Sequence, residues 1–152
     1  MPTLTLNEFL KGVGAKPEPS GWFVMGQDRI DTFAACTEDH QFIHVDLEAA
    51  SQTPFGTTIA HGFLTLSMLA KMTQDLLVAP EGAAMGLNYG FDKVRFLAPV
   101  KAGKRIRCHT EVTKIEQKDN KRILITQAIT VEIEGEEKPA LVAEWLNMLF
   151  LD

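Results

Sequence analysis

The stretch from Ile59 to Val78 constrains the fold of this chain more than any other. An Ile-Ala-His-Gly segment leads into a run from Phe63 to Val78 that contains no proline or glycine. The run contains leucine, methionine, alanine, lysine and glutamine, which are good helix formers. Its apolar side chains lie around most of the helical wheel, as is typical of a helix buried on nearly all sides. The sequence therefore predicts a long central helix around which the rest of the chain is wrapped.

The same run is not expected to cross a membrane. Lys71, Gln74 and Asp75 interrupt it before it reaches the roughly 20 apolar residues that a bilayer-spanning helix needs. The 152 residues, of which 45% are apolar and 23% charged, are most simply one soluble globular domain over residues 1–152. The formal charge of −5 argues against bulk affinity for nucleic acid.

The cysteines and the start of the chain give no sign of secretion. Cys36 and Cys108 form neither a metal-binding nor a disulfide pattern. The residues from Met1 to Leu4 lack the basic segment and apolar run of a signal peptide. The sequence therefore predicts a cytoplasmic location.

Local signals predict helices early and strands late in the chain. A capping box at Thr5–Glu8, apolar spacing and an N-cap at Asp46 predict short helices after Thr5, over 28–37 and over 47–50. Strands are predicted over 22–25, 87–96, 104–115, 122–134 and 141–151. Short turns join the later strands, which makes them antiparallel neighbours. This order is typical of the α+β class, with an antiparallel sheet curled around the long helix.

The polar segment from Glu38 to His44 is the strongest candidate for a site. Asp39 and His44 are about 140° apart on one regular helix, so they converge only across a turn or a broken helix. A carboxylate beside an imidazole can hold a water molecule and transfer its proton near neutral pH. Gly62, at the start of the central helix, adds an unpaired backbone N–H that can bind an oxyanion. Spacing alone leaves a second interpretation open, in which Asp39 caps a turn and His44 is a structural histidine.

These segments resemble the MaoC-like (R)-specific enoyl-CoA hydratases and dehydratases, which have the hot-dog fold. The family motif Gly-Asp-x-Asn-Pro-[Leu/Ile/Val]-His is represented here by Glu38-Asp39-His40-Gln41-Phe42-Ile43-His44, which departs from it at the Gly, Asn and Pro positions. Asp39 and His44 match the family's catalytic pair, and Gly62 matches the glycine whose N–H binds the thioester oxygen. The Asp-His-Gln-aromatic-Ile-His variant is similar to the branch that includes nodulation protein N.

The resemblance implies an activity and a set of partners. It implies reversible addition of water to a trans-2-enoyl-CoA, with an (R)-3-hydroxyacyl thioester as product. It implies a homodimer and no cofactor beyond the coenzyme A of the substrate. It also places Gln41, His61, Asn88 and Tyr89 along the substrate channel.

Two other functions remain open from the sequence. A hot-dog thioesterase would cleave the thioester, but the central helix offers only Asp75, about three turns from Gly62, as its carboxylate. A non-catalytic acyl-CoA-binding module would keep the pocket without needing both Asp39 and His44.

Two further patterns carry weaker predictions. His40 and His44 have the spacing of a zinc-protease motif, but Gln41 cannot act as the general base and no third ligand follows, so no metal is expected. Segment 93–107 contains six basic and no acidic residues, namely Lys93, Arg95, Lys101, Lys104, Arg105 and Arg107. This segment could attract the phosphates of coenzyme A, or it could be the solvated outer face of two strands.

Overall fold

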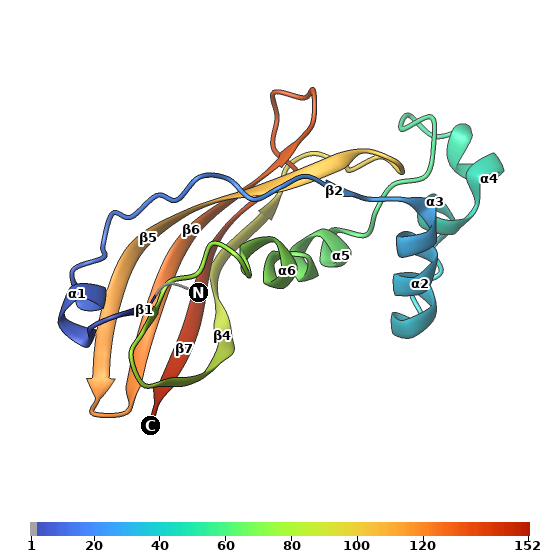
Figure 1. The fold of residues 1–152 in the computed structure, drawn as a ribbon. Helices are drawn as coiled ribbons and strands as arrows, with labels where there is room; N and C mark the ends of the chain where they lie inside the picture. The colour runs from blue at the N-terminus through green and yellow to red at the C-terminus, as the bar shows by residue number, and fades with distance from the viewer. Residues whose placement is uncertain (1–2) are drawn as a thin grey trace.

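A computed structural model describes residues 3–152 of the chain (Figure 1). Its elements in chain order are β1 (Thr3–Leu4), α1 (Leu6–Leu10), β2 (Phe23–Val24), α2 (Gln27–Thr37), α3 (Phe42–Val45), α4 (Leu47–Ser51), α5 (Gly62–Ser67), α6 (Leu69–Thr73), β3 (Ala79–Pro80), β4 (Ala83–Phe96), β5 (Arg105–Asp119), β6 (Arg122–Ile133) and β7 (Leu141–Leu151). The helices come mainly before the long strands, which confirms the predicted α+β order.

The four long strands and the short β2 form one five-stranded antiparallel sheet in the order β2-β5-β6-β7-β4. The sheet curls, and α5 and α6 lie against it, while α2, α3 and α4 extend beyond one end (Figure 1). A curled antiparallel sheet around a helix is the hot-dog arrangement, and this prediction is confirmed. Within residues 3–152, no helix is long and apolar enough to cross a membrane.

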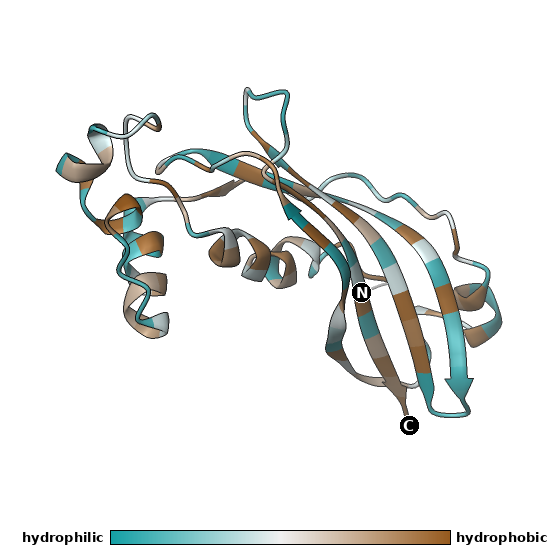
Figure 2. Cartoon of the chain, turned by 180° about the vertical axis from the view of Figure 1, so that it is seen from behind, coloured by the Kyte–Doolittle hydropathy of each residue, from teal (hydrophilic) through white to brown (hydrophobic). Residues whose placement is uncertain are grey.

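Alternation along the strands explains why one sheet face is buried. β5 and β6 place polar and apolar residues in turn, visible as bands along the strands in Figure 2. The apolar side chains on the helix-facing side of the sheet form the core together with side chains of α5 and α6. The sheet contributes Ile106, Cys108, Ile129, Val131, Ile133, Leu141, Ala143 and Trp145, and the two helices contribute Leu64, Leu69 and Met72. Burial of each large aliphatic side chain contributes about 1.5–3 kcal/mol.

The central helix is shorter and less buried than the sequence predicts. The expected helix from Phe63 to Val78 is wrong in its second half, because the helical hydrogen bonds are interrupted at Met68 and α6 ends at Thr73. Burial on nearly all sides is also wrong for the single chain, since Phe63 is 68% exposed. The buried residues instead form one stripe against the sheet. The residues after α6 leave the helix because β3 pairs in parallel with β1.

The end of α2 is set by a residue in a left-handed conformation. Glu38 is the C-cap of α2 with φ 62° and ψ 20°, and it is the non-glycine residue with positive φ among the described ones. Glycine is favoured at such a position because it has no Cβ to meet the carbonyl oxygen. Glu38 stands where the motif of the resembled family has glycine, and it adopts the left-handed conformation nonetheless.

Replacement of this residue gives a stability prediction. Glu38→Gly is expected to raise the free energy of unfolding by about 1 kcal/mol, because it relieves the left-handed strain. Thermal and urea unfolding would measure the change, and Glu48→Gly, inside α4, serves as a control that should destabilise by a similar amount. If Glu38→Gly lowered the free energy of unfolding as the control does, the left-handed conformation of Glu38 would not destabilise the protein.

Candidate active site

Backbone hydrogen bonds bring the loop before α5 alongside α3. The N–H of Ile59 donates to the carbonyl of Ile43 over 2.9 Å, and the N–H of Ala60 donates to the carbonyl of Val100 over 2.7 Å. The loop is therefore held between α3 and the segment after β4. This arrangement delivers His61, the N-cap of α5, to the same place as the polar segment that follows α2.

His44 lies on α3 with a defined tautomer. It is 7% exposed, and its Nδ1 lies 2.7 Å from the carbonyl oxygen of Ile59. A carbonyl can only accept, so Nδ1 carries the proton and Nε2 presents a lone pair. Burial is the main cause that lowers the pKa of His44, and His61 lowers it further, while the Ile59 carbonyl and Asp39 oppose the shift. A neutral His44 is thus ready to accept a proton at Nε2.

Asp39 both caps a turn and lies beside His44, so it fits both of the interpretations that the sequence leaves open. Its Oδ1 accepts a hydrogen bond of 3.3 Å from the backbone N–H of Gln41, so it does cap a turn. It is exposed, and its carboxylate belongs to a cluster with His44 and His61 whose ligand-type atoms all lie within 4.8 Å of one another. A turn between α2 and α3, rather than one regular helix, produces this convergence.

His61 is the most buried member of the cluster. It is 2% exposed, its Nε2 lies 3.0 Å from the backbone carbonyl of Asp39, and its ring stacks on His44 with 3.8 Å between centroids. Its Nδ1 is buried and has no hydrogen-bond partner among residues 3–152.

The geometry of the cluster disfavours a metal ion. The rings of His44 and His61 stack with an interplanar angle of 23°. Imidazole lone pairs lie in the ring plane, so the lone pairs of two stacked rings run side by side and do not converge on one point. The nitrogen Nδ1 of His44 is also occupied by the Ile59 carbonyl. This supports the expectation that no metal binds, as does the exposed position of His40.

Gly62 is the first residue of α5, next to His61. Among the described residues, its backbone N–H has no acceptor. A Cβ at this position would lie 3.1 Å from the ring of Phe96, which itself forms an edge-on pair with Phe63 at 6.1 Å. The glycine therefore allows close approach of the aromatic ring and leaves its N–H open.

Gln27 supports the site and was missed by the sequence analysis. Its Nε2 donates to the carbonyl of His44 over 2.7 Å, and its Oε1 accepts from the hydroxyl of Thr58 over 2.6 Å. It thereby ties α2 to α3 and to the loop before α5. The residues it joins are 17 and 31 positions away, and no local signal marks such contacts.

Two predicted channel residues lie away from the cluster within one chain. Gln41, the N-cap of α3, is beside Asp39, but Asn88 and Tyr89 lie in the middle of β4. A strand rises about 3.3 Å per residue, so Asn88 is about 25 Å along β4 from Phe96, the residue next to Gly62. The structure therefore groups His61 and Gln41 with the candidate dyad, and leaves the other two apart from it.

Part of the basic segment 93–107 is neutralised. Arg107 forms an ion pair with Glu132 at 2.6 Å, and Arg105 pairs with Glu134. Both arginines alternate along β5 with buried core residues, so they lie on the outer face of the sheet. For these two residues, the solvated outer face is the better interpretation.

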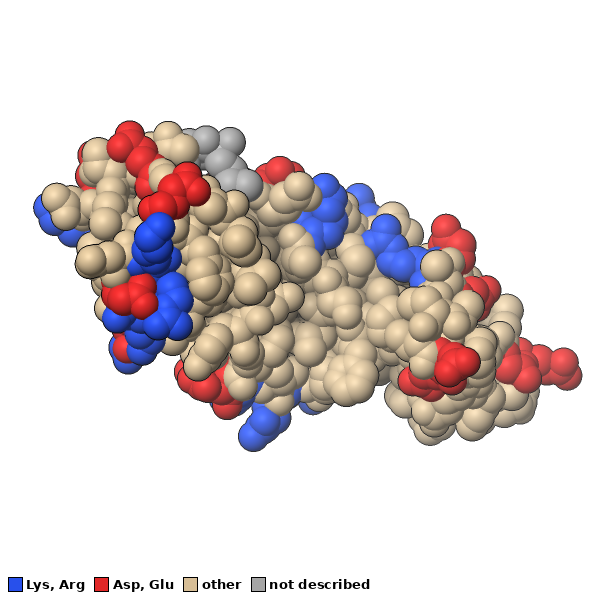
Figure 3. Space-filling model, turned by 90° about the horizontal axis from the view of Figure 1, so that it is seen from below, with Lys and Arg blue, Asp and Glu red and all other residues tan. Residues whose placement is uncertain are grey.

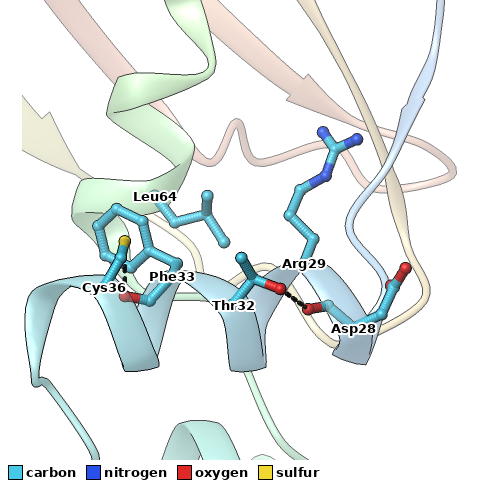
Figure 4. A pocket seen from close by; sticks show the side chains of 6 residues that line it. All are labelled: Asp28, Arg29, Thr32, Phe33, Cys36 and Leu64. Atoms are coloured by element: carbon cyan, nitrogen blue, oxygen red, sulfur yellow. Dashed lines mark hydrogen bonds between the residues drawn. The ribbon is translucent and has the colours of Figure 1, made fainter.

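A solvent-open cavity of about 360 Å³ lies between α2 and α5 (Figure 4). Its walls combine charged, polar and apolar side chains, namely Asp28, Arg29, Thr32, Phe33, Cys36 and Leu64. Phe33 also contacts His61, with 4.9 Å between ring centroids. The cavity thus adjoins the candidate site through one shared side chain.

Comparison with known proteins gives the same picture over the whole chain. Residues 8–134 match the MaoC-like domain family. Nodulation protein N of Rhizobium leguminosarum bv. viciae is 43% identical over 153 residues, covering 100% of this chain and 95% of that protein. The 3-hydroxyacyl-thioester dehydratase Z of Mycobacterium tuberculosis is 45% identical over 131 residues, or 86% of each chain.

A solved structure has the same fold as this chain. A monoamine oxidase regulatory protein from Archaeoglobus fulgidus has a TM-score of 0.83 and 27% sequence identity, and the match covers 100% of this chain and 97% of that one. The overall fold is therefore shared with a known structure over the full length of this chain.

Proposed function

The chain belongs to the MaoC-like dehydratase family, and from this premise we propose that it adds water reversibly to a trans-2-enoyl thioester of coenzyme A. Membership of a hydratase and dehydratase family makes a lyase-type enzyme the supported class. The observation that carries the proposal is the convergence of Asp39 and His44 within 4.8 Å, close to the open N–H of Gly62. The proposed product is the (R)-3-hydroxyacyl thioester.

The geometry suggests a role for each group. The thioester oxygen accepts a hydrogen bond from Gly62 N–H, which polarises the conjugated double bond. Asp39 and His44 hold one water molecule, and Nε2 of His44 accepts its proton as the oxygen bonds to C3. The electron pair of the C2–C3 double bond moves toward the thioester oxygen, and C2 then takes a proton from the dyad. One water is consumed, and both side chains return to their starting states.

An absorbance assay with crotonyl-CoA tests this function directly. Addition of water removes the conjugated alkene, so absorbance falls, and longer enoyl-CoA substrates then define the chain length accepted. Coenzyme A release, measured with a thiol reagent while the alkene persists, would instead identify a thioesterase. Binding of enoyl-CoA without any turnover would identify a binding module.

The central helices place no carboxylate of the kind that a hot-dog thioesterase needs beside Gly62, among the residues that the structure describes. Asp75 follows the end of α6 and is exposed. It is 13 positions from Gly62, and both α5 and α6 separate the two residues in the chain. The carboxylate that lies with His61, the neighbour of Gly62 in the chain, is that of Asp39, which matches the aspartate of the family motif.

We also propose that the protein is a homodimer joined at β4. This strand is an edge of the sheet, and its unpaired backbone groups need a partner or protection. Large apolar side chains on it are exposed, namely Met85, Leu87, Tyr89 and Phe91. Figure 3 shows that the centre of one face of the molecule carries few charged side chains, which lie mainly around the margin of that face.

Equilibrium sedimentation at micromolar concentration is expected to give about twice the 16.8 kDa chain mass. Leu87→Glu places a charge in the proposed interface and is expected to produce monomers. Val24→Glu is a matched control, because Val24 is equally exposed, at 52%, but lies on β2 at the opposite edge of the sheet. A wild-type monomer with full activity, or dissociation by the control variant alone, would contradict the β4 interface.

A further inference from the structure

The imidazole of His61 contacts both members of the proposed dyad. Its Nε2–H donates to the backbone carbonyl of Asp39, and one ring face stacks on His44. Phe33 of α2 contacts the same ring. Because His61 is 2% exposed, these neighbours define its position closely.

We propose that His61 is a positioning residue, which fixes the backbone of Asp39 through its Nε2–H and seats the ring of His44 through its own ring face. One side chain then determines how far apart the carboxylate and the imidazole are held. The effect on catalysis rests on the proposed hydration. The effect on the tautomer and charge of His44 does not rest on it, and it can be measured without any substrate.

The stack has an electrostatic consequence. The ring centroids of His44 and His61 are 3.8 Å apart, and the neighbouring imidazole lowers the pKa of His44, although burial is the larger cause. The groups that face His61 are the carboxylate of Asp39 from the turn, His44 from α3 and the uncharged ring of Phe33 from α2. His61 therefore helps to keep His44 neutral and able to accept a proton.

A simpler side chain can supply either function of His61, but not both together. Glutamine places its amide nitrogen where Nε2 lies, so it can keep the hydrogen bond to Asp39 but loses the stacked ring. Phenylalanine keeps a ring against His44 but loses the donor. These two variants separate the two contacts.

Nitrogen-detected NMR of the histidine side chains in the full-length protein tests the proposal. In the wild type, His61 is expected as the Nε2–H tautomer and His44 as the Nδ1–H tautomer. In His61→Gln, the pKa of His44 should rise, because the neighbouring imidazole that lowers it has been removed. His40→Gln is the matched control, since His40 is exposed and outside the cluster, and it should leave the titration of His44 unchanged.

Kinetics provide the second measurement. His61→Phe is expected to lower kcat by about 10²-fold with little change in KM, because it releases the backbone of Asp39. In His61→Gln, the acidic limb of the rate profile should move to higher pH together with the pKa of His44. A wild-type His61 in the Nδ1–H tautomer, or an unmoved His44 titration in a folded His61→Gln, would overturn the proposal. A raised KM with unchanged kcat in His61→Phe would also overturn the proposal, and it would indicate that His61 lines the substrate channel.

If the protein showed no hydration of any enoyl-CoA, the proposed function would fail while the NMR result still decided the role of His61. Conversely, active enzyme with unmoved His44 titration would leave the hydration intact and remove only the positioning role. The two failures are therefore distinguishable.

Discussion

Asp39→Asn and His44→Gln are each expected to lower the kcat of enoyl-CoA hydration by about 10²- to 10⁴-fold. Both side chains act on the same water in the proposed mechanism, and their ligand-type atoms lie within 4.8 Å. Removal of either one leaves the other without a function. The double variant is therefore expected to be scarcely worse than either single variant.

These substitutions should leave the fold largely intact. Asp39 is exposed, and its Asn replacement can still accept the hydrogen bond from Gln41. His44→Gln loses a buried hydrogen bond to the Ile59 carbonyl, at a cost of about 1 kcal/mol. Thermal unfolding would measure this cost, and His40→Gln would serve as the exposed control with normal kcat.

Multiplicative losses in the double variant would contradict a shared water, because independent groups give independent factors. Near-normal activity in either single variant would remove that residue from the mechanism. Loss of activity in proportion to loss of folded protein would assign His44 a structural role.

Gly62→Val is expected to cut kcat/KM by about 10²- to 10³-fold, the usual effect of losing one oxyanion donor. A branched side chain here stands between the helix-start N–H and an incoming thioester oxygen. It must also displace the ring of Phe96, since even a Cβ would lie 3.1 Å from it. Gly62→Ala should cut the rate less, because the half-exposed ring can shift by a few tenths of an ångström.

Stability separates the oxyanion role from simple packing. Alanine is favoured over glycine by about 1 kcal/mol inside a helix, so helix propensity alone predicts that Gly62→Ala is stabilising. The rate and the melting temperature should therefore change independently. Gly21→Val is a suitable control, because no atom lies within 4 Å of a Cβ at that loop position.

The oxyanion role would be wrong if Gly62→Ala were as folded and as active as the wild type, and Gly62→Val lost activity only in step with its stability. Gly62 would then be a residue whose absent side chain serves the packing of Phe96. Combination of Gly62→Ala with Phe96→Leu distinguishes the two cases further, since a pure packing effect should be relieved by the smaller neighbour.

The sequence by itself determined the elements that depend on neighbouring residues. Alternation over two residues predicts β5, β6 and β7, since each side chain's face follows from its position in the strand. The capping box of α1 is present as predicted, with hydrogen bonds between Thr5 and Glu8 in both directions. Asp46 caps α4 through the N–H of Ala49, also as predicted. Each of these interactions spans five residues or fewer.

Tertiary structure decided where the central helix ends and how much of it is buried. The apolar run continues to Val78, but pairing of β3 with β1 draws the chain out of the helix after Thr73. The exposed Phe63 has an apolar side chain that no local rule distinguishes from the buried Leu64. The position of the sheet, and not helix propensity, makes that distinction.

The candidate site divides in the same way. The sequence identified Asp39, His44 and Gly62 by residue type and motif, but their spacing on a regular helix would have kept the first two apart. Their convergence depends on the break after α2 and on hydrogen bonds that His44 makes to Ile59, 15 positions away, and to Gln27, 17 positions away. Such contacts form only when distant segments are packed together, so no periodic or local pattern in the chain encodes them.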